Sequence, residues 1–152
     1  MELIGEFEVT LDAKGRFLLP ALIRKRLPED YGGEFIMARG EGSYLNLFPK
    51  ISWTSIMEKD FAKVNQMNKD GADYLRAMLR GATPMEFDSA GRLLVPPGLK
   101  KHAGLEKEVV LQCVRDRVEI WDKQKLEEWQ NGMTEEKLRQ LSEIVNGGPR
   151  LA

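Results

Sequence analysis

The chain has 152 residues, 42% apolar and 31% charged, which excludes a disordered or collagen-like protein and is typical of a soluble globular one. With 23 basic residues against 24 acidic ones, the net charge of −1 gives no sign of a nucleic-acid binder. One cysteine, Cys113, and one histidine, His102, exclude an internal disulfide and most zinc sites and histidine-based triads, so no metal or cofactor is expected.

The chain carries an internal repeat. Residues 5–28 align with residues 81–104 at an offset of 76, with seven of 24 positions identical, and the likeness continues weakly from 34–48 into 108–121. We therefore predict a tandem duplication of a unit of about 45 residues. The identical pairs are Gly5/Gly81, Asp12/Asp88, Gly15/Gly91, Arg16/Arg92, Leu18/Leu94, Pro20/Pro96 and Lys25/Lys101.

The first half of a unit is expected to form a strand, a turn and a second strand. Apolar residues alternate with polar ones over 6–11, which predicts a half-buried strand. In the turn that follows, Asp12 can accept backbone N–H groups and Gly15 can take a left-handed φ, which would close a short hairpin. Residues 17–19 predict a second strand that is apolar on both faces and so enclosed between two layers.

The second half of a unit is expected to add a helix and two strands. Pro20 and Pro28 bound a short predicted helix over 21–27, and strands are predicted at 34–38 and 44–48. The second unit repeats this β-β-α-β-β order, with the turn Asp88–Arg92 built around Gly91.

Helices are predicted after each unit. Ser52 is expected to cap a helix whose apolar stripe is Trp53, Met57, Phe61 and Val64, and residues 70–80 predict a second helix. After the second unit, Leu126 and Trp129 mark a short helix, and Thr134 is expected to cap a last one before a frayed tail at 147–152.

These elements predict an α+β fold. A unit of about 45 residues is too small to bury a good core alone. The two units should therefore pair strands across a pseudo-twofold axis into one swapped-hairpin, double-psi type of barrel with helical extensions. The predicted segments are unit 1 at 5–51, a helical connector at 52–80, unit 2 at 81–124 and C-terminal helices with the tail at 125–152.

The charge is unevenly distributed along the chain. Residues 13–28 carry +5 and residues 89–105 carry +3 without a single acid, which leaves −9 on the remainder. Both stretches span a turn and a short helix, and basic side chains there suit phosphate contact. Acid-free runs of this length also arise by chance. The candidate DNA-binding residues are Lys14, Arg16, Arg24, Lys25 and Arg26 in unit 1 and Arg92, Lys100 and Lys101 in unit 2.

The recurring turn arginine has two interpretations. It could be held to the turn aspartate as a local ion pair, or its guanidinium could fork onto phosphate or the edge of guanine. Arg16 and Arg92 recur while Lys14 is replaced by Ala90, and a turn needs Asp and Gly but not Arg. This favours a role in binding.

Residues 12–27 resemble the AbrB-like DNA-binding hairpin, in which a turn and Arg precede an apolar strand, a proline and a basic helix. Two such units in a chain of this length resemble the MraZ family. The resemblance implies ring-shaped homo-oligomers and a repressor of transcription that acts on direct repeats ahead of the bacterial division and cell-wall gene cluster. It places the principal DNA contact at Arg16, with Arg92 as its counterpart.

Two other functions remain open. An enzyme could use Asp12 and Asp88 as paired carboxylates, although an aspartate at the start of a glycine turn already has a structural role. A ring-forming adaptor or antitoxin-like scaffold could instead bind a protein through the Trp53 and Trp129 helices. No signal peptide or membrane-spanning run is recognised, so we expect a cytoplasmic, nucleoid-associated protein without a membrane partner.

Overall fold

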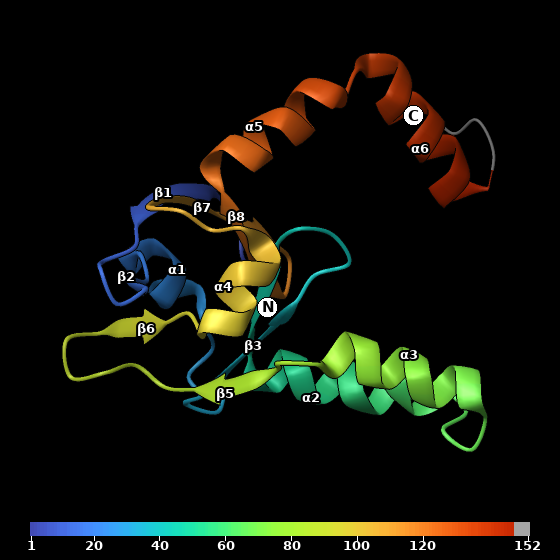
Figure 1. The fold of residues 1–152 in the computed structure, drawn as a ribbon, viewed down its shortest axis with the longest axis horizontal. Coiled ribbons are helices and arrows are strands. Elements are labelled where there is room, and N and C mark those ends of the chain that lie inside the picture. Colours follow the sequence, from blue (N-terminus) through green and yellow to red (C-terminus); the bar gives the residue numbers. More distant parts are fainter. Residues whose placement is uncertain (148–152) are drawn as a thin grey trace.

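The computed structural model describes residues 1–147, and the predicted frayed tail beyond Gly147 lies outside the described residues. Figure 1 shows strands gathered in a central body from which two helical arms extend. The elements in chain order are β1 (Glu6–Thr10), β2 (Arg16–Leu18), α1 (Ala21–Arg26), β3 (Phe35–Arg39), β4 (Leu45–Pro49), α2 (Lys50–Lys59), the 3-10 helix η1 (Phe61–Lys63), α3 (Lys69–Leu79), β5 (Thr83–Met85), β6 (Arg92–Leu94), α4 (Pro97–Ala103), β7 (Glu108–Val114), β8 (Arg117–Asp122), α5 (Lys123–Gly132) and α6 (Glu135–Asn146).

The two units interleave their strands as the repeat predicts. A six-stranded antiparallel sheet has the order β1-β7-β8-β4-β3-β5, and a two-stranded sheet pairs β2 with β6. Exchanging each strand for its counterpart in the other unit reverses the order of the larger sheet and leaves it otherwise unchanged. The α+β fold with a pseudo-twofold, strand-swapped body is therefore confirmed.

The turn after β1 differs from the simple hairpin that its composition predicts. β1 pairs with β7, whereas β2 pairs with β6, so the turn joins two sheets rather than two neighbouring strands. The reason is that β1 and β2 of unit 1 each pair with a strand of unit 2.

Buried and exposed side chains alternate along β2 and β6, so the prediction of a strand enclosed on both faces is wrong. Phe17 and Leu19 are buried, as are their counterparts Leu93 and Val95. Leu18, between them, is 56% exposed, because only one face of the two-stranded sheet covers the core.

The first helical arm also begins and ends differently from the prediction. α2 starts at Lys50 directly after Pro49, and Ser52 is buried within the helix rather than capping it. The helix ends at Lys59, so Phe61 belongs to η1 and the predicted stripe is divided between two elements.

The later helices agree with the prediction. α3 and α5 lie where they were expected. The hydroxyl of Thr134 accepts a hydrogen bond from the backbone N–H of Lys137 and caps α6, which ends at the left-handed Gly147. Within residues 1–147, no helix combines the length and the hydropathy needed to cross a membrane.

Candidate nucleic-acid interface

The two Asp-x-x-Gly-Arg turns lie side by side. The β2–β6 ladder places Phe17 opposite Leu93, and the backbone N–H of Val95 donates to the carbonyl of Gly15 at 2.9 Å. Each turn directly precedes one of these short strands, so the ladder brings the turns together. We call residues Asp12–Arg16 turn 1 and residues Asp88–Arg92 turn 2.

Turn 1 is held by the carboxylate of Asp12. Its Oδ1 accepts the backbone N–H groups of Lys14 and Arg16, each at 2.9 Å. The N–H of Gly15 donates to the carbonyl of Asp12, and Gly15 has a φ of +86°, which a residue with a side chain rarely adopts. The turn is thus closed by the Asp12 carboxylate and by backbone bonds, and the Lys14 side chain remains exposed.

Turn 2 repeats this geometry. Oδ1 of Asp88 accepts the N–H groups of Ala90 at 2.9 Å and Arg92 at 2.8 Å, and Gly91 has a φ of +77°. Ala90 stands where turn 1 has Lys14, so the turn itself does not require a lysine side chain.

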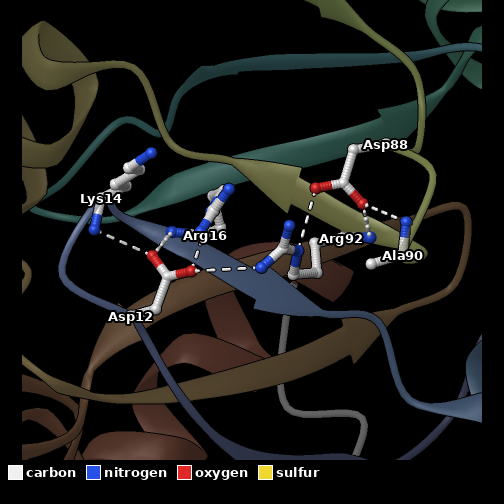
Figure 2. Close-up of polar contacts among 6 residues, drawn as sticks. All are labelled: Asp12, Lys14, Arg16, Asp88, Ala90 and Arg92. Atoms are coloured by element: carbon white, nitrogen blue, oxygen red, sulfur yellow. Dashed lines mark hydrogen bonds and ion pairs between the residues drawn. The ribbon is translucent and has the colours of Figure 1, made fainter.

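Both turn arginines form local ion pairs. Arg16 donates from Nε to Oδ2 of Asp12 at 2.8 Å, and Arg92 donates from Nε to Oδ2 of Asp88 at 2.9 Å. Nη1 of Arg92 also lies 3.7 Å from Oδ2 of Asp12, which links the turns across the pseudo-twofold axis (Figure 2). The local ion pair and a role in binding are compatible, because holding Nε fixes the plane of a guanidinium that has other donors.

The electrostatics of this cluster keep both carboxyls ionised. Three hydrogen bonds lower the pKa of Asp12 from 3.8 to about 2. The largest effect comes from the backbone N–H of Arg16, and the Arg16 side chain and the backbone N–H of Lys14 add to it. The backbone N–H of Arg92 is the largest cause of the lowered pKa of Asp88. Two carboxylates that share a catalytic proton would instead have one raised pKa. Because the pKa is lowered at both carboxyls, these shifts give no support to a general acid formed by Asp12 and Asp88.

The short helices contribute basic residues to the opposite unit's turn. Arg24 of α1 donates from Nε to the carbonyl of Leu19 at 3.2 Å, and its guanidinium carbon lies 5.0 Å from the centre of the Phe87 ring, directly before turn 2. Conversely, Lys100 of α4 lines one hollow with Asp12 and Ala13 of turn 1. Each basic cluster is thus assembled from both units.

The other predicted basic residues of α1 and α4 have different surroundings. Lys25 and Lys101 are exposed on α1 and α4. Arg26 lies near β7, where its charge opposes the rise in the pKa of the Cys113 thiol that burial causes. The contacts of Arg24 thus lie next to turn 2, whereas the charge of Arg26 acts on Cys113 of β7.

Two contacts were not visible in the sequence. Phe87, in the segment before turn 2, supports Arg24 from the other unit. His102 lies 3.0 Å from the carbonyl of Gly42 through Nε2 and 3.4 Å from Arg39 Nη1 through Nδ1, so it ties α4 to the loop after β3. Neither pairing follows from sequence spacing, because each joins the two units.

Comparison with known proteins agrees with this architecture. The family model for the MraZ protein, also described as antitoxin-like, matches the chain twice, at residues 3–77 and 78–144. A protein named transcriptional regulator MraZ from Thermoanaerobacter sp. (strain X514) is 37% identical over 85% of this chain and 87% of its own length. Proteins with the same name from Lactobacillus delbrueckii subsp. bulgaricus and Desulforamulus reducens are 37% and 36% identical, over 87% and 93% of this chain and 89% and 96% of theirs. The chain therefore belongs to the MraZ family of transcriptional regulators.

Proposed function

We propose that this chain binds double-stranded DNA through the joined turns and the basic faces of α1 and α4. The observation that carries the proposal is the β2–β6 ladder, which brings Arg16 and Arg92 together on one side of the body. Ion pairs to Asp12 and Asp88 hold both guanidinium groups in fixed orientation before DNA arrives. A preordered side chain loses less conformational entropy on binding.

The charge distribution supports the same interface. The eight candidate basic residues lie on two acid-free stretches, while the rest of the chain carries −9. Such segregation attracts the phosphate backbone to one surface and repels it from the others. Lys14, present in turn 1 only, makes unit 1 the principal contact and unit 2 the weaker one.

We further propose that the protein represses transcription from direct repeats ahead of the division and cell-wall gene cluster, including its own gene, on the nucleoid. The family to which the chain belongs supports this proposal. A few phosphate contacts per subunit bind weakly, and a ring-shaped homo-oligomer would hold several interfaces at the spacing of the repeats. Simultaneous contacts then raise the affinity through effective concentration.

An electrophoretic shift assay with the DNA upstream of the protein's own gene tests the proposal. A probe with several repeats should bind more tightly than one with a single repeat, and the affinity should fall by roughly 0.9 log unit per tenfold increase in salt for each phosphate neutralised. Arg16→Ala should weaken binding by about tenfold or more, since a hydrogen bond to a charged group contributes about 1.5–3 kcal/mol.

The matched control is Arg139→Ala, which removes an arginine from the exposed helix α6, where it pairs with Glu136. It should leave the shift unchanged. If Arg16→Ala binds the repeat probe like the unaltered chain, the proposed interface is wrong. An absent or salt-insensitive shift would favour the protein-binding adaptor.

A further inference from the structure

Two leucines lie exposed on the small sheet that joins the turns. Leu18 in β2 is 56% exposed and Leu94 in β6 is 48% exposed, whereas the residues before them, Phe17 and Leu93, are buried. Leu18 and Leu94 are also one of the identical pairs of the internal repeat. A large apolar side chain stabilises a fold mainly when it is buried, so the fold does not require leucine at these positions. Both units therefore keep an apolar side chain that the body of the protein leaves uncovered.

The exposed leucines share one face with the turn arginines. Side chains alternate between the two faces of a strand, so the arginine and the leucine of each strand project from the same face. In the ladder, Arg16 is opposite Leu94 and Leu18 is opposite Arg92. Each leucine thus lies beside the arginine of the other unit, at the roughly 5 Å spacing of directly opposed side chains. We call Arg16, Leu18, Arg92 and Leu94 the ribbon face.

The surroundings of the ribbon face are basic. Cδ1 of Leu94 lies 4.0 Å from the position that a Cβ on Gly15 would take, which places this leucine against turn 1, where Lys14 is exposed. Nη2 of Arg24 lies 3.2 Å from the equivalent position on the glycine of turn 2. The acids of the two turns are already paired with the turn arginines. The ribbon face therefore suits a polyanion that also presents apolar groups.

The major groove of DNA has this combination of groups. It admits a two-stranded β-ribbon, and thymine presents its C5-methyl group there, while guanine presents two acceptors that suit arginine. An apolar side chain in this groove contacts the thymine methyl. A leucine beside an arginine therefore matches a thymine beside a guanine or a phosphate.

We propose that Leu18 and Leu94 contact the C5-methyl groups of thymines in the major groove when the turn arginines bind DNA. Phosphates are present in every sequence, whereas a methyl contact favours thymine at the base pair beside each leucine. The two leucines are equivalent, so each unit adds its own preference for thymine. This inference rests on the proposed function, because it requires the β2–β6 ribbon to lie on DNA, and it adds a source of sequence preference.

A probe without thymine methyl groups tests the contact. The DNA upstream of the protein's own gene is prepared in two forms, one with thymine and one with uracil at every thymine position. Uracil keeps the charge and the base pairing of thymine and lacks only the methyl group. In shift assays, the unaltered chain should bind the uracil probe about fourfold more weakly for each methyl group that binding buries.

Variants assign the effect to the leucines. When Leu18→Ala and Leu94→Ala are combined, the ratio of the affinities for the two probes should fall to about one. Leu138→Ala is the matched control and should keep the ratio of the unaltered chain. Leu138 is 59% exposed on α6, which Figure 1 shows on the side of the body away from β2 and β6. A change in assembly or in phosphate contact affects both probes alike and cancels in the ratio.

The outcomes separate this inference from the proposed function. Equal affinity of the unaltered chain for the two probes would overturn the thymine contact and leave the DNA interface in place. A ratio that persists in the double leucine variant would also overturn it, because the methyl groups would then act through DNA shape or other residues. If neither probe shifts, the proposed function and the thymine contact both fail. Arg16→Ala should weaken binding of both probes and keep their ratio, whereas the double leucine variant should unfold at nearly the same temperature as the unaltered chain.

Discussion

Nη1 of Arg92 in turn 2 lies 3.7 Å from Oδ2 of Asp12 in turn 1, and the same oxygen accepts the Nε of Arg16 at 2.8 Å. Asp12 therefore faces both turn arginines, whereas Asp88 pairs with Arg92. This asymmetry makes the two aspartates unequal, although their turns are nearly identical.

Asp12→Asn should weaken DNA binding more than Asp88→Asn. Asparagine keeps an oxygen that accepts the turn N–H groups, but it removes the charge that orients the arginines. Each side chain that must then be ordered on binding costs about 0.5–1.5 kcal/mol, which is about a two- to tenfold loss of affinity. Titration of a labelled repeat probe at fixed salt measures the difference.

The direction of the change in affinity shows whether the aspartates orient the arginines or act only through their negative charge. If the aspartates acted only through their negative charge, each Asn variant would bind DNA more tightly, since an acid beside the phosphates is repulsive. Tighter binding by Asp12→Asn would contradict the positioning role.

The contribution of Asp12 to stability should be lost in acid. Its pKa is about 2 in the folded chain against an ordinary 3.8, so ionised Asp12 stabilises the fold above pH 3.8, and this contribution disappears as the pH falls through about 2. The free energy of unfolding of the unaltered chain, minus that of Asp12→Asn, should be constant near neutrality and shrink over this window. Urea denaturation at several pH values tests this, and a difference that grows in acid would contradict it.

Adjacent leucines should respond differently to truncation. Leu19→Ala, at a side chain that is 1% exposed, should reduce the free energy of unfolding by about 2–5 kcal/mol, because it leaves a cavity in the core. Leu18→Ala removes the same atoms from an exposed side chain and should change it by less than about 0.5 kcal/mol. Equal losses in denaturant titrations would mean that β2 is covered on both faces after all.

Substitutions at Arg24 and Lys25 should have different effects, because Arg24 stabilises the fold through Phe87 whereas Lys25 is exposed and available to phosphate. Arg24→Ala removes the contact with Phe87 and should cost stability, about 0.5–1 kcal/mol for an exposed cation–π pair. Lys25→Ala should leave thermal unfolding unchanged and reduce the slope of affinity against salt by about 0.9. A salt slope that is unchanged in Lys25→Ala would remove α1 from the interface.

Local sequence was sufficient for the parts that depend on neighbouring residues. The left-handed φ of Gly15 and Gly91 and the Thr134 cap were predicted correctly, because both features depend on residues only a few positions apart. The start of α2 was not, since Pro49 and the packing of Ser52 outweighed the capping preference of serine.

The sequence by itself determined the duplication, the two turns, the uneven charge and the family. Only the tertiary structure decided that β2 pairs with β6 and that Arg24 supports the opposite unit's turn. The physical reason is that spacing along a chain reports local geometry, whereas these contacts depend on which unit supplies each partner. The repeat makes two partners nearly equivalent in sequence, and the packing of the whole body selects between them.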